Sequence, residues 1–415
     1  MTKSVAIVGS GPSGCYLAQA LLKASPGLRV DLLDSLPVPY GLVRYGVAPD
    51  HQGTKAVTRQ FERLFERQGA RFIGNVIVGK DISLEDLRTA YDAVVLAVGL
   101  SADRRLGIPG EELEGVVGAG ALTRALYEHP DADPLPALGP HVIIMGNGNV
   151  AIDLLRLLAK TPDELAGSDL GPAPSDWLAR SGISDIEIIG RSPAAQAKFD
   201  PVMVKELAKL SGVTIRVLEA GASEDPEAVK KIEALRSIDG HGSGPRRLTF
   251  RFGLTPIALE GKHGRVTEAH FRSAKGDLVA LPCSAFLKAI GFETDGVLRR
   301  EALIEGALDA ANGVLAPGFY ATGWFRRGPR GTIPENRADA QHLAARILAD
   351  LNDQPSTSQK PGTVQLNGHA VVGYEGWKKI DAAETSNPPE NRCRVKISTR
   401  AEMLLIARQN EDPGQ

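Results

Sequence analysis

Short apolar runs, each followed by glycines and then by an amphipathic stretch, set the pattern of this chain. The first run, Val5–Val8, predicts a buried strand, and the residues from Cys15 to about Ala24 have the spacing of a helix. A second apolar run, Arg29–Leu33, ends at the acidic residue Asp34. This order of strand, helix and strand predicts a βαβ unit, in which the two strands lie parallel in one sheet.

The same pattern returns in the middle of the chain. Val142–Met145 predicts a strand, a helix is expected to end near Lys160, and Ile186–Ile189 predicts the next strand, which is followed by Arg191. The intervening residues 161–182 are rich in Pro, Gly and Ser and are interpreted as an inserted connection. Two such units indicate an α/β protein with two Rossmann-like dinucleotide-binding domains.

The remaining segments suggest how the two domains are connected. The loop 37–51 contains three prolines and two glycines, which fix its path. Further elements are expected as a helix over about 55–68, a strand over 93–97, a strand from 318 into the glycine turn before Trp324, a helix over about 337–351, a polar linker over 352–363 and a short αβ tail.

The late strand is expected to complete the sheet of the first domain, because it follows the second βαβ unit and runs into its own glycine turn. The second domain is then an insertion. We expect a first, discontinuous domain over 1–103 and 317–415, and an inserted second domain over 104–316.

The first strand enters a Gly-x-Gly-x-x-Gly motif, in which each glycine has a physical task. Gly9 permits a tight turn, Gly11 lets the backbone approach a pyrophosphate, and Gly14 lets helix and strand pack closely. The helix N-terminus directs partial positive charge at the phosphates. Asp34, about 20 residues after the last glycine, can accept hydrogen bonds from a ribose diol. The motif predicts a dinucleotide site, against the alternative of a plain βα turn.

The second motif, Gly146-Asn-Gly-Asn-Val-Ala151, has the same form with alanine in the third position. An NAD site places an acid at the end of the following strand, but this chain has Arg191 there. A guanidinium group suits a ribose 2′-phosphate, and the alternative is a solvated charge at a strand end. The acid at one site and the arginine at the other predict FAD at the first and NADPH at the second.

Composition excludes several function classes. The chain has 48 Lys plus Arg and 50 Asp plus Glu, so no overall positive charge indicates nucleic acid. The three cysteines, Cys15, Cys283 and Cys393, form no Cys-x-x-Cys pair, which disfavours a disulfide reductase, a zinc site or an iron–sulfur cluster, and no metal is expected. No apolar run is long enough to span a membrane, and a cytoplasmic location is expected by default.

Several stretches, shared in register, resemble one family. Pro37–His51, Gly74–Gly79, Gly146–Asp153 and Gly323–Ile333 are similar to segments of the adrenodoxin-reductase family of ferredoxin–NADP reductases. The resemblance covers nearly the whole chain. It implies a monomer that passes a hydride from NADPH to FAD, and then single electrons to a ferredoxin-type iron–sulfur protein.

The resemblance also implies functional residues. Those for FAD, besides Gly9, Gly11 and Gly14, are Ser13, Asp34, Leu42, Val78, Trp324, Gly331, Thr332 and Ile333. Those for NADPH are Asn147, Gly148, Asn149 and Val150, with Arg191 and Ser192 at the 2′-phosphate. His51 and Asp153 match positions near the flavin and nicotinamide and are the candidate catalytic residues, which would tune proton delivery. Alternatively, Asp153 only bonds a neighbouring loop, and Trp324 only packs the core.

The chain departs from the family pattern at the predicted NADPH site. The family usually has two adjacent arginines at the phosphate, but the second is Ser192 here, and a glutamate that helps to fix the ribose is replaced by Met203. A hydroxyl can donate one hydrogen bond but carries no charge. We therefore expect only a moderate preference for NADPH over NADH.

Ferredoxins are strongly acidic, so the partner is expected to dock on cations. By resemblance, Lys23 and Lys205 match docking positions. Two arginine clusters are further candidates: Arg246, Arg247 and Arg251, and Arg326, Arg327 and Arg330. The alternative for each cluster is a solvated face or a set of buried ion pairs.

Two other functions stay open at this point. The first is a flavin reductase of a small molecule such as a quinone, which would need no iron–sulfur protein. The second is a non-catalytic FAD-binding subunit, which would not oxidise NADPH alone.

Overall fold

The computed structural model describes residues 2–295, 297–331, 333–353, 360–366 and 369–409. The chain forms two compact units, and each is described by itself. The first comprises Met1–Ala102, His129–Asp131 and Phe292–Gln415, and the second comprises Asp103–Glu128 and Ala132–Gly291. The second unit is therefore an insertion in the sequence of the first, and the two short strands β5 (Ala102–Asp103) and β15 (Phe292–Glu293) lie where the chain crosses between them.

The first unit is built on a six-stranded sheet of order β16-β17-β4-β1-β2-β3. Its strands are β1 (Ser4–Val8), β2 (Arg29–Leu33), β3 (Arg71–Ile73), β4 (Ala93–Leu96), β16 (Val314–Ala316) and β17 (Phe319–Ala321). All pairs are parallel except β16 with β17. In the central strand β1, Val5 and Ile7 enter one apolar cluster, whereas Ala6 and Val8 enter the other, so the sheet is buried on both faces.

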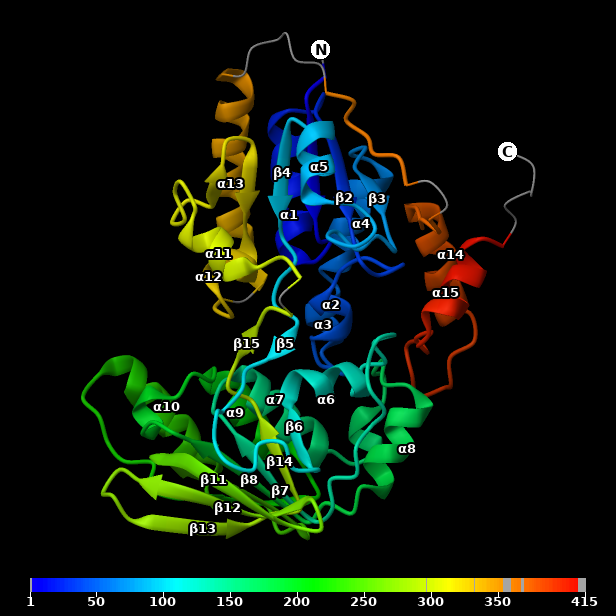
Figure 1. Cartoon of the computed structure of the whole chain (residues 1–415). Helices are drawn as coiled ribbons and strands as arrows, with labels where there is room; N and C mark the ends of the chain where they lie inside the picture. Colours follow the sequence, from blue (N-terminus) through cyan, green and yellow to red (C-terminus); the bar gives the residue numbers. More distant parts are fainter. Residues whose placement is uncertain (1, 296, 332, 354–359, 367–368, 410–415) are drawn as a thin grey trace. The chain divides into compact units, whose positions relative to one another are not determined.

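Helices cover both faces of this sheet (Figure 1). They are α1 (Pro12–Ala24), α2 (Leu42–Tyr45), α3 (Gln52–Lys55), α4 (Thr58–Glu66), α5 (Leu84–Ala90), α11 (Arg300–Glu305), α12 (Gly323–Arg327), α13 (Ile333–Asp353), α14 (Tyr374–Thr385) and α15 (Arg400–Ala407). Residues of α1, α4, α13, α14 and α15 fill one cluster, and Leu87 of α5 and Phe325 of α12 belong to the other.

The second unit has a six-stranded parallel sheet of order β6-β14-β7-β8-β10-β9. Its strands are β6 (Val116–Gly118), β7 (His141–Met145), β8 (Asp185–Gly190), β9 (Val213–Val217), β10 (Arg246–Phe252) and β14 (Ala285–Lys288). An antiparallel sheet of β11 (Leu254–Lys262), β12 (Arg265–Ser273) and β13 (Leu278–Pro282) contributes to the cluster on one face.

The other face of this sheet packs against helices. The helices of the second unit are α6 (Ala119–Leu126), α7 (Asn149–Ala159), α8 (Pro172–Arg180), α9 (Pro201–Glu206) and α10 (Pro226–Ile238), with the 3₁₀ turns η1 (Asp163–Leu165), η2 (Ala194–Gln196) and η3 (Leu207–Lys209). None of the described helices in either unit is long and apolar enough to cross a membrane.

Several expected boundaries differ from the structure. The second unit ends at Gly291 rather than at residue 316, because β16 joins the sheet of the first unit and Leu303 of α11 packs against its core. Helix α1 begins at Pro12 rather than at Cys15, since proline suits the first helical position.

Other elements are longer or more broken than expected. The helix predicted over 55–68 is two helices, α3 and α4, and the one predicted over 337–351 is the longer α13. The connection 161–182 contains η1 and α8. The tail is the pair α14 and α15, with no strand among its described residues, and the predicted linker 352–363 lies partly outside those residues.

Candidate functional site

The glycine turn after β1 has the shape of a phosphate cradle. Gly9 has a φ of 109°, and a Cβ added there would lie 2.5 Å from Ala97 O. A Cβ at Gly14 would lie 2.0 Å from Gly9 O, so neither position accepts a side chain. At Gly11, by contrast, the nearest atom to an added Cβ is Gly41 Cα at 4.0 Å. The start of α1 therefore faces open space, as the approach of a pyrophosphate requires.

Asp34, directly after β2, holds this turn in place. Its carboxylate accepts hydrogen bonds from Ser10 N–H at 2.9 Å, from Ser10 Oγ at 2.5 Å and from Leu36 N–H at 3.0 Å. Burial raises the pKa of Asp34, and the hydrogen bonds from Ser10 and Leu36 oppose that change. The sequence analysis missed Ser10, because it occupies an unspecified position of the glycine motif.

The thiol of Cys15 also serves the turn. It is buried, and its Sγ donates to Ser10 O at 3.1 Å. Burial raises the pKa of this thiol well above its usual value. Cys15 is therefore a core residue and lacks the thiolate character of a reactive cysteine.

Helix α12 packs closely against the start of α1. Gly323 has a φ of 63°, and a Cβ there would lie 2.2 Å from Ser13 Oγ. The next residue, Trp324, donates from Nε1 to Gly331 O at 3.1 Å and stacks on Phe292 with ring centroids 5.8 Å apart. Ser13 thus lies against Gly323 at the start of α12, and the next residue, Trp324, is bonded to Gly331.

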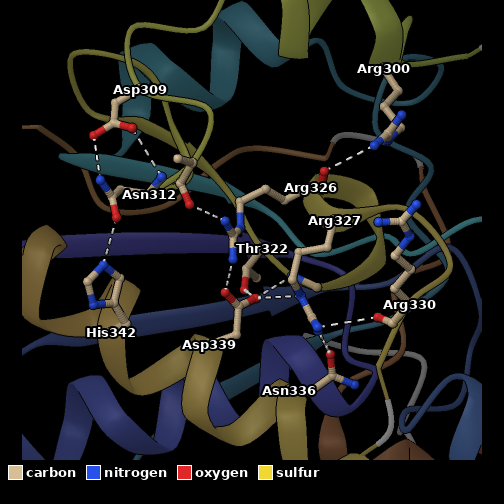
Figure 2. A network of polar contacts seen from close by, with 12 residues as sticks. Arg300, Asp309, Asn312, Thr322, Arg326, Arg327, Arg330, Asn336, Asp339 and His342 are labelled. Carbon is tan, nitrogen blue, oxygen red and sulfur yellow. Dashed lines mark hydrogen bonds and ion pairs between the residues drawn. The ribbon is translucent and has the colours of Figure 1, made fainter. Parts of the chain in front are cut away.

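A buried carboxylate on α13 fixes α12 from the other side (Figure 2). Asp339 accepts from Thr322 Oγ1 at 2.9 Å and Gly323 N–H at 3.0 Å, and it pairs with Arg326. Arg327 lies 3.4 Å from the same carboxylate through Nε and donates to Asn336 Oδ1 at 2.5 Å. Both guanidinium groups are therefore tied to this network. Arg330 accepts from Arg327 Nη1 through its backbone carbonyl at 3.3 Å, and its side chain is exposed (Figure 2).

The remaining predicted residues of the first unit are placed as follows. Leu42 on α2 is 45% exposed, whereas Val78 is buried. His51 immediately precedes α3 and is partly buried. Ile333 begins α13 and packs against the core, and Thr332 lies outside the described residues.

The second glycine turn, after β7, resembles the first. Gly146 has a φ of 127°, and a Cβ there would lie 2.2 Å from Ala289 O, but a Cβ at Gly148 would meet nothing within 4 Å. Asn147 contacts Gly190 at the end of β8, and its amide Nδ2 is buried with no hydrogen-bond partner among the described residues. A dinucleotide fits this turn, because the backbone is open at Gly148 and a buried donor has no acceptor.

Helix α7 carries the other residues predicted for the second site. Asn149 accepts from Asp200 N–H at 2.8 Å through Oδ1, and Val150 packs against the core. Asp153 pairs with the buried Arg156 at 3.2 Å. His51 and Asp153 belong to different units.

Arg191 and Ser192 follow the end of β8. Arg191 is exposed, and its guanidinium has no hydrogen-bond or ion-pair partner within the described ranges. Ser192 is partly buried. An unpaired cation at the carboxyl end of a parallel strand is well placed for an anionic ligand.

The three arginines of β10, one of the two predicted docking clusters, all have hydrogen-bond or ion-pair partners. Arg246 donates to Ile183 O at 3.0 Å and Ala159 O at 2.8 Å, and burial lowers its pKa. Arg247 pairs with Asp185. Arg251 is likewise paired, with Glu187. The predicted docking lysines Lys23 and Lys205 are both exposed.

One group of possible metal ligands occurs among the described residues, on β11 and β12. His270 Nε2 lies 3.0 Å from Glu268 and 3.3 Å from Glu260, and these two glutamates face each other across the strands.

Comparison with known proteins agrees with this geometry. Residues 3–233 match the family model "Pyridine nucleotide-disulphide oxidoreductase". The chain is 43% identical over 422 residues to "Cindoxin reductase" of Citrobacter braakii, and the alignment covers 98% of this chain and 91% of that protein. It is 34% identical over 450 residues to "NADPH-ferredoxin reductase FprA" of Mycobacterium tuberculosis, covering 97% and 98%.

Two further relatives extend the comparison. "NADPH:adrenodoxin oxidoreductase, mitochondrial" of Arabidopsis thaliana is 32% identical, over 97% of this chain and 95% of that protein. The solved structure "Mycobacterium tuberculosis FprA in complex with NADPH" matches with a TM-score of 0.88 and 32% identity, over 98% of this chain and 100% of that chain. These full-length matches confirm the resemblance seen in the motifs: the chain belongs to the adrenodoxin reductase/FprA-like family of ferredoxin–NADP reductases.

Proposed function

We propose that this protein is an FAD-dependent enzyme that oxidises NADPH and supplies single electrons to a ferredoxin-type iron–sulfur protein. One observation carries the proposal: a single chain holds two open glycine turns, one followed by the carboxylate of Asp34 and the other by the unpaired guanidinium of Arg191. The names of its relatives, which include an NADPH-ferredoxin reductase and an NADPH:adrenodoxin oxidoreductase, support the same function.

The first unit holds FAD in this proposal. Gly11 admits the pyrophosphate, and Asp34 keeps about one acceptor site for the ribose after accepting two hydrogen bonds from Ser10 and one from Leu36. The contacts to the rest of the cofactor would come from Ser13, Leu42, Val78, Trp324, Gly331 and Ile333, with Gly9 and Gly14 shaping the turn. When bound, FAD accepts a hydride from NADPH and releases electrons one at a time.

The second unit holds NADPH. The turn Asn147–Val150 would bind the pyrophosphate, with the buried Asn147 amide as a donor, and Arg191 would bind the 2′-phosphate. Ser192 would add a hydrogen bond without a charge. Arg156 orients the carboxylate of Asp153, and we keep Asp153 and His51 as candidates for proton delivery.

Docking residues for the iron–sulfur protein are proposed in each unit, Lys23 in the first and Lys205 in the second. Lys23 lines a cleft of about 520 Å³ in the first unit together with Arg67 and Arg337, and none of the described residues that line the cleft carries a carboxylate. An acidic partner would be steered by such cations, and salt would screen them over about 10 Å at 0.1 M. Arg246 and Arg247 are weaker candidates, because their guanidinium groups already have partners.

The test uses the purified protein. It should be yellow, NADPH should bleach the flavin under anaerobic conditions, and cytochrome c reduction should require added ferredoxin. Lys23→Glu and Lys205→Glu should raise the KM for ferredoxin and leave reduction of a small neutral acceptor unchanged, with Lys262→Glu, an exposed lysine on β11, as the matched control.

The alternatives appear as different outcomes. If no NADPH oxidation occurs in a protein that holds FAD, the chain is a non-catalytic flavin-binding subunit. If salt and both charge reversals affect the ferredoxin and small-acceptor assays alike, the small-molecule reductase is the better interpretation.

A further inference from the structure

The segment before α9 lies against the start of α7. Lys198 N–H donates to Asn147 O at 3.2 Å, and Lys198 forms a parallel bridge with Gly148. Asn149 accepts from Asp200 N–H at 2.8 Å through its side chain. These contacts fix the backbone of Lys198 beside the open glycine of the second turn.

The side chain of Lys198 is directed away from the core. Its neighbours Ala197 and Phe199 are 0% and 2% exposed and belong to the core cluster, whereas Lys198 is exposed. In an extended segment, alternate side chains lie on opposite faces. The ammonium group has no partner among the residues that the structure describes, and the nearby Asp200 carboxylate accepts from Val202 N–H to cap α9.

The N-terminus of α7, beside Lys198, already has the properties of an anion-binding site. Helix α7 is 11 residues long and begins directly after Gly148, where the backbone is open. The Asn147 amide is a buried donor without an acceptor among the described residues. Arg191, which has no partner among the described residues, follows the end of β8, and its neighbour is the uncharged Ser192. A second cation fixed at Gly148 would offset part of the ligand's charge.

We propose that Lys198 pairs with the pyrophosphate of the dinucleotide held at the N-terminus of α7. This inference rests on the proposed function, in which the second unit binds NADPH. Lys198 thereby contributes affinity that NADPH and NADH share, whereas Arg191 contributes affinity that depends on the 2′-phosphate. The two residues divide the binding of NADPH into a common part and a selective part.

The experiment measures equilibrium binding to the FAD-loaded protein without turnover. The probes are NADP⁺, NAD⁺ and adenosine 2′-phosphate, which has the 2′-phosphate but no pyrophosphate. The variants are Lys198→Met, Lys198→Arg and Arg191→Ala. The matched control is Lys209→Met, an exposed lysine of the same unit that precedes the amino end of β9, away from the carboxyl ends of β7 and β8.

Lys198→Met should weaken both NADP⁺ and NAD⁺ by about five- to tenfold and leave adenosine 2′-phosphate unchanged within about twofold. Lys198→Arg should retain most of the affinity. Arg191→Ala should weaken NADP⁺ and adenosine 2′-phosphate and spare NAD⁺.

Three results would overturn the inference. Binding by Lys198→Met that matches Lys209→Met means that Lys198 has no part in the site. A loss confined to NADP⁺ and adenosine 2′-phosphate means that Lys198 contacts the 2′-phosphate instead. If the unaltered protein binds neither NADP⁺ nor NAD⁺, the proposed function itself fails. If Arg191→Ala weakens NADP⁺ binding but Lys198→Met has no effect, the proposed function stands and only the inference about Lys198 fails.

Discussion

Removal of the Asp339 carboxylate should loosen the segment that carries Trp324. In the Asp339→Ala variant, Thr322 Oγ1 and Gly323 N–H lose their acceptor, and Arg326 loses its counter-ion. The Asp339 side chain is only 9% exposed, so water does not readily replace the carboxylate. The variant tests whether this network holds the proposed flavin site together.

The expected cost follows from those contacts. Each buried donor left without an acceptor costs about 1–3 kcal/mol, and breaking a buried charge pair costs about 3–5 kcal/mol. The lower end applies, because Arg326 is 16% exposed and keeps a hydrogen bond to Ala311 O. We expect Asp339→Ala to lower the free energy of unfolding of the first unit by about 5 kcal/mol, and Asp339→Asn, which keeps one acceptor oxygen but loses the negative charge, by about 3 kcal/mol.

The pH dependence has a definite sign. Burial acts to raise the pKa of Asp339, but the hydrogen bond from Gly323 N–H and the positive charge of Arg326 outweigh it, and the pKa is lowered. A lowered folded-state pKa means that the contribution is fully present above the unfolded value of about 3.9 and is lost as the pH falls through the folded value. The difference between parent and variant should be constant near neutrality and shrink in acid.

Urea unfolding is monitored by the increase in fluorescence as the flavin is released, a signal that reports on the first unit. A signal specific to this unit is needed because two units need not unfold together. The control is Asp309→Ala, which removes a carboxylate from the turn at Asn312 and should leave the transition unchanged. If Asp339→Ala and Asp309→Ala unfold at the same urea concentration as the parent, the network does not stabilise this site.

Three further predictions concern single residues. Gly14→Ala would place a Cβ 2.0 Å from Gly9 O, so the purified variant should lose its FAD, as measured by absorbance after gel filtration. Arg246→Ala should destabilise the second unit by about 1–2 kcal/mol in urea unfolding, because two backbone carbonyls lose their donor; an unchanged transition would return this arginine to the docking candidates. Burial raises the pKa of Cys283 to about 12, so iodoacetamide near neutral pH should label the exposed Cys393 and spare Cys283, as peptide mass spectrometry would show.

The two glycine turns could be predicted from the sequence because their spacing encodes the physical requirement itself. A tight turn, an open backbone and a close helix contact each need a residue without a Cβ. A Cβ added at Gly9, Gly14 or Gly146 would lie 2.5, 2.0 or 2.2 Å from a backbone oxygen, which is closer than any side chain allows. Boundaries were less predictable, since Pro12 starts its helix before the periodic apolar positions begin.

The order of the strands in the sheet could not be predicted from the sequence, and this order determines which charged side chains form ion pairs. Arg247 and Asp185 are far apart in the sequence, yet they face each other because β10 pairs with β8 in a parallel register. Arg251 and Glu187 meet across the same two strands. A sequence shows only that such residues are charged; which of them are neutralised depends on a pairing that no local pattern specifies.

The difference between Arg191 and the arginines of β10 nevertheless follows a rule of parallel sheets. Arg246 and Arg247 stand at the amino end of their strand, where they meet a carbonyl of the α7 C-terminal turn and the amino end of β8. Arg191 follows the carboxyl end of β8, where the chain turns away and leaves the guanidinium unpaired. Ligands of open α/β sheets bind beyond the carboxyl ends of the strands, next to helix N-termini. Whether an arginine lies at the amino or the carboxyl end of its strand therefore predicts ligand binding better than its membership of a cluster of basic residues. By that criterion Arg191 and Lys198, not the arginines of β10, are the cations to substitute first.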